Sequence, residues 1–181
     1  MNNFKKNQGF TQHQIKFGAG FTIIESLVAI TILILAVTGA ASVIQTGISS
    51  YIFSKDQIIA FYLAQEGFEQ IRNIRDENSI NNKDWLTDLT GCFSGNACTV
   101  SPAESSVVTV CSGAGNCPVL RQNPNTGFFG YDLSWTPTIF KREIVLTQIN
   151  ANETSILVTI DWSKGLVNRQ FRARENILDW Q

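Results

Sequence analysis

The chain has 181 residues, of which 44% are hydrophobic and 16% charged, and its formal net charge at pH 7 is −1. The charges are unevenly distributed, because residues 17–54 carry a single formal charge, that of Glu25. Three lysines and no acid precede this block, whereas residues 55–181 hold eleven bases and fourteen acids. The composition therefore excludes a disordered chain and predicts no basic surface for binding nucleic acid.

Residue types that carry catalysis are scarce. The only histidine is His13, upstream of the apolar block, so we expect neither a Ser/His/Asp or Cys/His arrangement nor a histidine-ligated catalytic zinc. Gly113 and Gly115 form a GxG pair that lacks a third glycine and a preceding strand, and no GxxxxGK[ST] sequence occurs. We therefore expect no catalytic residue, no metal site and no cofactor, and a protein that is not an enzyme.

An apolar block of 24 residues, 21–44, dominates the N-terminal region. As a helix it would measure about 36 Å, enough to cross a bilayer core of about 30 Å. The basic leader before it, with no positive cluster until Lys55, predicts a cytoplasmic N-terminus and a C-terminal region outside. The block alone leaves open a plain signal anchor, or a secretory signal cleaved at the small residues 38–41.

Glu25 argues against both of these interpretations. An ionised carboxylate within hydrocarbon costs about 3 kcal/mol on insertion scales, and neither an anchor nor a secretory signal gains from it. The cost is explained if the carboxylate meets a free α-amino group that lies four residues earlier in the chain of a neighbouring copy. Such an amino group exists only if the chain is cleaved just before Phe21.

The segment GFTIIESLVAI, residues 20–30, follows a basic leader and resembles the prepilin signature of type IV pilins and type II secretion pseudopilins. In those families a membrane-embedded aspartyl prepilin peptidase cuts after the glycine and N-methylates the new first residue. The resemblance implies that Gly20 is the cleavage residue, Phe21 the N-methylated terminus and Glu25 the assembly carboxylate.

Two departures from this pattern favour a minor subunit or pseudopilin over a major pilin. The 20-residue leader is longer than in many type IVa pilins, and Ser42 stands where major pilins usually carry a helix-kinking proline. The segment FYLAQEGFEQIRNIRD, residues 61–76, further resembles the LAQEGxExxRxxRD stretch of PilV-type minor pilins and I-type minor pseudopilins.

Helical periodicity continues past the apolar block through residues 45–77. One face carries an apolar stripe with spacings of three, four or seven residues: Ile52, Ile59, Leu63, Gly67, Ile71 and Ile74. We interpret this stripe as the surface against which the C-terminal domain packs. The helix is predicted to end near Glu77, with a solvated opposite face that includes Lys55, Gln65, Glu69 and Arg72.

Residues 78–181 are predicted to form a globular β-rich head. Strand signals occur at 106–111, 129–135, 138–148, 154–162 and 166–173, with a hairpin turn at 163–165. An antiparallel sheet packed on the long helix follows, which is an α+β class and, by the resemblance, a pilin fold. The likeness to PilV-type heads extends to a pairing of 140–144 with 158–162 and to a closing strand at 177–180.

All four cysteines lie in the head and repeat a C-x5-C spacing, Cys92 with Cys98 and Cys111 with Cys117. Two local disulfides are the simplest of the three possible pairings, and pairing between the two loops stays open. The spacing is longer than the C-x2-4-C typical of zinc sites. Disulfides also fit a head outside the cytoplasm.

The expected protein is a minor pilin or pseudopilin subunit, processed by prepilin peptidase and assembled into a type IV pilus or type II secretion-like filament. Its partners would be the peptidase, other pilin or pseudopilin subunits, the inner-membrane assembly platform and the lipid bilayer. It would cross the cytoplasmic membrane once, with its head outside, before it enters an extracytoplasmic filament. The alternative is an anchored or secreted extracytoplasmic binding module whose disulfide-stabilised β head does not polymerise.

Overall fold

A computed structural model describes residues 20, 22–101, 107–113 and 115–179. Helix α1 (Ile23–Ile80) has 58 residues and ends three residues beyond the predicted Glu77. The elements that follow it are η1 (Thr87–Cys92), β1 (Cys98–Ser101), β2 (Val107–Val110), β3 (Val119–Gln122), β4 (Phe129–Gly130), β5 (Thr136–Asn150), β6 (Glu153–Lys164) and β7 (Val167–Leu178). The chain divides into two compact units between Ser49 and Ser50, called here the N-terminal unit and the head unit.

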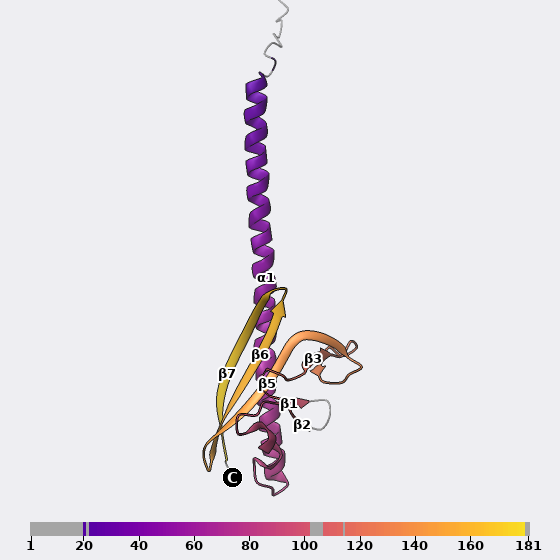
Figure 1. The fold of residues 1–181 in the computed structure, drawn as a ribbon, viewed down its shortest axis with the longest axis vertical. Coiled ribbons are helices and arrows are strands. Elements are labelled where there is room, and N and C mark those ends of the chain that lie inside the picture. The colour runs from indigo at the N-terminus through magenta and orange to yellow at the C-terminus, as the bar shows by residue number, and fades with distance from the viewer. Residues whose placement is uncertain (1–19, 21, 102–106, 114, 180–181) are drawn as a thin grey trace, which may run out of the picture. The chain divides into compact units, whose positions relative to one another are not determined.

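The sheet of the head unit is antiparallel, and β5 is its central strand. One edge of β5 pairs with β6, which also pairs with β7; the other edge pairs with β1 and β3, which continue to β2 and β4. Phe140 lies opposite Trp162 and Ile144 opposite Val158, so the predicted pairing of 140–144 with 158–162 is confirmed. Figure 1 shows β5, β6 and β7 as long ribbons beside the helix.

The structure differs from the predicted strands in several places. β1 and β3, of four residues each, were not predicted. The predicted strand 129–135 is a strand only over Phe129–Gly130, whereas β7 continues to Leu178 instead of ending at residue 173. Residues 102–106, which include the first residue of the predicted strand 106–111, lie outside the described residues, as does Trp180.

The hairpin turn between β6 and β7 is also shifted from its predicted position at 163–165. β6 continues through Lys164, which pairs with Val167, so the turn consists of Gly165 and Leu166. Gly165 has a φ of 61°, and a glycine with positive φ at the first of two turn residues is the pattern of a type II′ turn.

The core of the head unit lies between α1 and the inner face of the sheet. The apolar residues and glycine that α1 buries are Ala60, Leu63, Ala64, Gly67, Phe68, Ile71 and Ile74. Ile52 and Ile59 of the predicted stripe are only half-buried. From β6, alternate residues Ile156, Val158 and Ile160 face this helix and are fully buried. The predicted α+β class, with a long N-terminal helix packed on an antiparallel sheet, is therefore confirmed.

Candidate assembly segment and head-docking residues

The start of α1 is fixed by Thr22. Its hydroxyl oxygen accepts a hydrogen bond from the Glu25 backbone N–H at 3.3 Å, and its carbonyl accepts one from Ser26 N–H at 3.1 Å. Thr22 is therefore the N-cap and Glu25 the third helical residue, the T-x-x-E arrangement of a capping box. Gly20 is exposed, and Phe21, the predicted N-methylated residue, lies outside the described residues.

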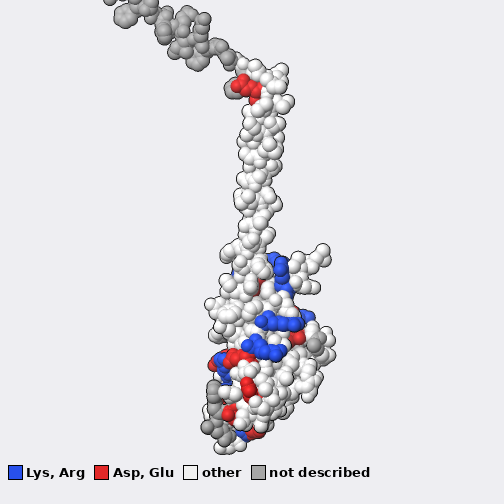
Figure 2. All heavy atoms as spheres, turned by 90° about the vertical axis from the view of Figure 1, so that its left-hand side faces the viewer, with Lys and Arg blue, Asp and Glu red and all other residues white. Residues whose placement is uncertain are grey.

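The apolar segment that follows has no covering layer within the described chain. Every residue from Thr22 to Tyr51 is exposed, and α1 contains an 18-residue window of mean hydropathy 2.6 with no part buried. Figure 2 shows this helix surface as uncharged except for one acidic side chain at its start, which the sequence identifies as Glu25. The length and composition are sufficient for one membrane crossing.

Three threonine hydroxyls within this segment are satisfied by the helix itself. The hydroxyls of Thr31, Thr38 and Thr46 donate to carbonyl oxygens three or four residues earlier, at 2.8, 2.8 and 3.0 Å. Such bonds remove the need for water at these hydroxyls, which is the condition for placing threonine in hydrocarbon. Glu25 differs from these hydroxyls because it carries a formal charge, the only one in the block.

Arg142 on β5 forms hydrogen bonds that connect the sheet to the helix α1. Its side chain is fully buried and faces α1, where its Nη1 donates to Glu66 Oε2 at 3.1 Å and to the Leu63 carbonyl at 3.2 Å. Its Nη2 donates to Gln70 Oε1 and to the Val100 carbonyl, both at 3.0 Å. One guanidinium thus joins α1, β5 and β1, and only its Nε lacks a hydrogen bond among the described atoms.

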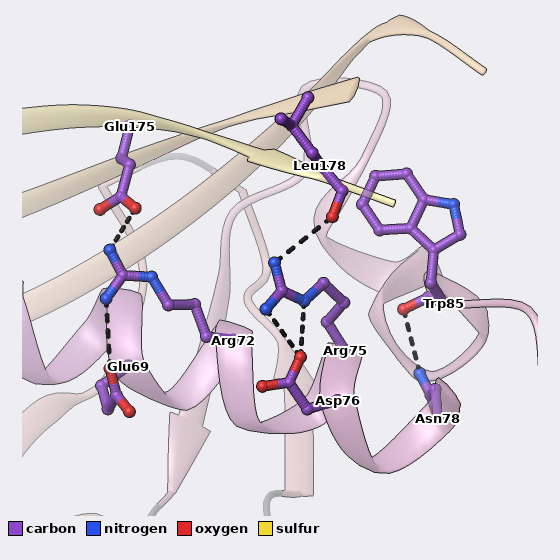
Figure 3. A network of polar contacts seen from close by, with 8 residues as sticks. All are labelled: Glu69, Arg72, Arg75, Asp76, Asn78, Trp85, Glu175 and Leu178. Atoms are coloured by element: carbon purple, nitrogen blue, oxygen red, sulfur yellow. Dashed lines mark hydrogen bonds and ion pairs between the residues drawn. The ribbon is translucent and has the colours of Figure 1, made fainter. Parts of the chain in front are cut away.

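A second set of polar contacts joins the C-terminal part of α1 to β7, as Figure 3 shows. Arg72 donates to Glu175 on β7 and, at 3.2 Å, to Glu69 on its own helix. The hydrogen bond from Arg72 to Glu175 raises the pKa of Arg72, since the bond and the carboxylate charge both favour the protonated guanidinium. One turn later, Arg75 pairs with Asp76 and donates to the Leu178 carbonyl at 3.4 Å.

The segment 61–76 therefore acts in this structure as a docking strip. Three of its charged side chains, those of Glu66, Arg72 and Arg75, bond to strands of the sheet. The loop after α1 is held separately, because Asn78 Nδ2 donates to the Trp85 carbonyl at 3.3 Å (Figure 3). The predicted apolar stripe accounts for burial, while these polar bonds fix the angle and register of the sheet on the helix.

Two disulfides close short loops in the head unit. Cys92 is bonded to Cys98 and Cys111 to Cys117, the local pairing, with Cα–Cα distances of 5.1 and 4.9 Å. Cys92 and Cys98 are fully buried in the core between η1 and β1. The Cys117 N–H donates to Glu143 Oε1 at 3.4 Å, so the second loop covers one carboxylate on the outer face of β5.

Tyr131 is half-buried, and its hydroxyl is fully buried. Burial raises the pKa of its hydroxyl, and the nearby positive charge of Arg142 offsets part of that shift. The hydroxyl has no hydrogen-bond partner among the described residues. Tyr131 is therefore held neutral against the same face of the sheet that carries the Arg142 network.

Among the described residues, no three histidine, cysteine, aspartate or glutamate side chains are grouped so that they could hold a metal ion. His13 lies outside the described part of the chain. The grooves of the head unit are shallow and of mixed polarity; one of about 560 Å³ is lined by residues of the first disulfide loop, such as Phe93 and Ser94, and by Leu146 on β5.

Two functional features were missed by sequence reasoning. Thr22 could have been identified as a cap from its spacing to Glu25, since T-x-x-E before an apolar run is a helix-start signature. Arg142 could have been noticed as a cation at an inward position of an alternating strand, between Phe140 and Ile144. Its four acceptors could not, because they lie on segments 42 to 79 residues away.

Comparison of the chain with protein-family models, with curated proteins and with solved structures gave no match. The geometry therefore defines a class of protein: an α+β protein with one N-terminal helix long and apolar enough to cross a membrane and a disulfide-bonded head.

Proposed function

We propose that this chain is a minor pilin or pseudopilin, processed by a prepilin peptidase and assembled into a filament through residues 21–44. The observation that carries the proposal is Glu25, a lone exposed carboxylate in the first turn of an otherwise uncharged and uncovered helix segment. Such a charge is costly in a bilayer unless a cation meets it, and a subunit with a free N-terminal amine supplies that cation.

The geometry supports processing just before the helix. Gly20 has no heavy atom within 4 Å of the position a Cβ would occupy, and it precedes the Thr22 cap by two residues. Gly20, the residue before the proposed cleavage, is therefore exposed and lies outside the helix. Cleavage after Gly20 would leave Phe21 as a charged terminus four residues from Glu25, and N-methylation would retain that charge.

Assembly then pairs charges between subunits. The Glu25 carboxylate of one subunit would pair with the Phe21 amine of its neighbour. The apolar faces of the helices would then contact one another instead of lipid. The expected partners are the peptidase, other pilin or pseudopilin subunits, the inner-membrane assembly platform and the bilayer. The head would lie outside the cytoplasmic membrane, where its two disulfides persist.

The N-terminal residue and mass of the protein from cells with an intact peptidase test this proposal. A chain that begins at N-methylated Phe21 is expected, and a Gly20→Asp variant should accumulate as full-length precursor in the membrane. A start near Ala41 would instead indicate a secreted domain, and an uncut Met1 a simple anchor. Either of those results would overturn the proposal.

The alternative, a binding module that does not polymerise, is separated by the state of the mature chain. A filament subunit should co-purify with filaments sheared from the cell surface or, for a secretion pseudopilin, cross-link to subunits of the same system. A binding module should be a monomer in mild detergent under the conditions in which the sheared fraction is collected.

A further inference from the structure

The tip of the β6–β7 hairpin combines apolar and basic side chains that the core does not use. Leu166 is fully exposed at the turn and Val167 is half-exposed beside it. Lys164 precedes the turn and Arg169 follows it, and both are exposed. An exposed leucine alone is common on protein surfaces, but an apolar tip flanked by cations is the arrangement of segments that lie in a membrane interface.

This tip lies at the end of the head unit where the chain enters from the N-terminal unit. The Arg169 guanidinium stacks over the ring of Phe53 on α1, 4.6 Å from its centroid. Phe53 follows Ile44, the end of the apolar block, by nine residues, a span of about 14 Å along a helix. If residues 21–44 cross a bilayer, the short length of chain between Ile44 and Phe53 limits how far this end of the head unit can lie from the lipid headgroups.

A groove of about 300 Å³ lies beside the hairpin and suits a headgroup. Lys141, Asn168 and Arg169 are among its lining residues and offer two cations and an amide. Ser163 adds a hydroxyl, and Asp161, whose carboxylate accepts from Gln170 at 2.8 Å, adds an acceptor. A phosphodiester fits the cations, and the hydroxyls of a glycerol headgroup fit the carboxylate.

The charges around the hairpin favour an anionic surface. Arg172 and Arg174 follow Arg169 on β7 and are exposed, and the acids nearest in the register are Asp161 on β6 and Glu175 on β7. Glu175 is already paired with Arg72. Figure 2, which views the side of the molecule where β7 lies in Figure 1, shows basic side chains gathered on the upper part of the head.

We propose that the β6–β7 hairpin docks on the bilayer surface, with Leu166 and Val167 in the interfacial layer and with Lys141 and Arg169 of the groove on the phosphodiester of an anionic glycerophospholipid. Lys164, beside the turn, adds positive charge at the same surface. This inference rests on the membrane-spanning part of the proposed function but not on cleavage or assembly. The hairpin would contact lipid while the subunit is in the membrane, before the subunit enters a filament. Each basic residue near an anionic surface is expected to strengthen docking about fivefold.

The test uses the full chain in nanodiscs that hold one copy each, made of phosphatidylcholine alone or of phosphatidylcholine and phosphatidylglycerol in equal amounts. Leu166→Cys is labelled, after the native disulfides have formed, with a fluorophore that reports polarity and is quenched from within the bilayer. We expect a blue shift and quenching that are stronger with phosphatidylglycerol. Leu133→Cys, 83% exposed outside the hairpin, is the matched control and should show neither effect.

Charge variants separate lipid recognition from simple proximity. Lys164→Glu should lower the docked fraction in phosphatidylglycerol discs, with an equilibrium shift of at least about fivefold. Lys83→Glu changes the net charge equally but lies beyond the C-terminal end of α1, so it should have no effect. Equal quenching in both lipid mixtures, unchanged by Lys164→Glu, would overturn the headgroup assignment.

Other outcomes are equally decisive. If protease protection shows that the chain spans the disc and the Leu166 label stays in water, the hairpin proposal fails and the proposed function stands. If the chain does not span the disc, both fail. A label that is shielded only in discs holding two copies would make a second subunit the occupant and would also overturn the lipid assignment.

Discussion

Arg142 Nη1 and Glu66 Oε2 lie 3.1 Å apart although 76 residues separate them in sequence. The arginine side chain is fully buried and the glutamate side chain is 33% exposed, so the pair marks the boundary between the core and solvent. A buried guanidinium is costly to desolvate, and here four acceptors compensate it. The interface between the sheet and the helix is therefore held by specific hydrogen bonds as well as by apolar packing.

Removing the Arg142 side chain should therefore strongly destabilise the head unit. We expect Arg142→Ala to lower the free energy of unfolding by about 3–5 kcal/mol, because it empties a core position and leaves buried acceptors without donors. Guanidinium unfolding of the full chain in detergent, with disulfides intact, measures this loss. Lys83→Ala, which breaks an exposed pair with Asp88, is the control and should cost less than about 1 kcal/mol. Equal losses in the two variants would contradict the assignment.

Gly67 is required by the close approach of helix and sheet. A Cβ at this position would lie 3.3 Å from Arg142 Cδ and 3.3 Å from Val158 Cγ1, and both neighbours are fully buried. We expect Gly67→Leu to destabilise the head by about 1–3 kcal/mol or more, and Gly67→Ala by less, since alanine gains helix propensity. Thermal unfolding can rank them against Gly47→Ala, where no atom lies within 4 Å. A neutral Gly67→Leu would show that the interface is looser than described.

Because of Tyr131, we expect the free energy of unfolding to decrease at high pH. Burial raises its pKa in the folded state, so above about pH 10 the unfolded chain loses the proton while the folded chain keeps it. The stabilisation of the folded state by protonated Tyr131 is fully present below about pH 10. Above that pH the free energy of unfolding falls by up to about 1.4 kcal/mol per pH unit. Unfolding curves between pH 8 and 11, at about half-unit steps, should show this decline in the native chain and a smaller one in Tyr131→Phe. Identical slopes would remove Tyr131 as the cause.

The assembly role proposed for Glu25 can be separated from capping of the helix by substitution. Glutamine keeps the capping-box composition but not the charge, so Glu25→Gln should leave cleavage nearly intact and lower filament incorporation at least about tenfold, given the roughly 3 kcal/mol at stake. Thr22→Ala removes the hydroxyl cap, at about 1 kcal/mol, and keeps the charge. Immunoblots of sheared filaments compare the two. Normal incorporation of Glu25→Gln would exclude charge pairing.

The two disulfides should contribute differently to the free energy of unfolding, although their loops have equal length. Each closure should contribute about 2 kcal/mol by the chain-entropy model. Replacing Cys92 and Cys98 by alanine should cost more than replacing Cys111 and Cys117, because the first pair lies in the core cluster and its loss also leaves a cavity. Denaturant midpoints of the two double variants give the comparison, and a larger loss for the second pair would reverse this ranking.

Much of the fold could be predicted because its signals are local. The helix was predicted over nearly its full length from apolar periodicity, and alternation in residues such as Ile156 and Val158 predicted the strand β6. The pairing of 140–144 with 158–162 was implied by the resemblance to PilV-type heads. The short strands β1 and β3 could not be predicted, since they depend on pairing with other strands: β1 with β2 and β5, and β3 with β4 and β5. The turn predicted at 163–165 lies at Gly165 and Leu166, because strand pairing extends through Lys164.

The candidate site divides in the same way. The linear features can be read from the amino-acid sequence: an apolar helix, its single carboxylate at Glu25, the glycine before it and two short cysteine loops. Each depends on neighbours within a few residues. The position and partners of Arg142 follow from packing, because its acceptors lie on the distant helix α1 and strand β1. The place of the hairpin tip beside Phe53 was likewise decided by packing, since more than one hundred residues separate Phe53 from Arg169 in the chain.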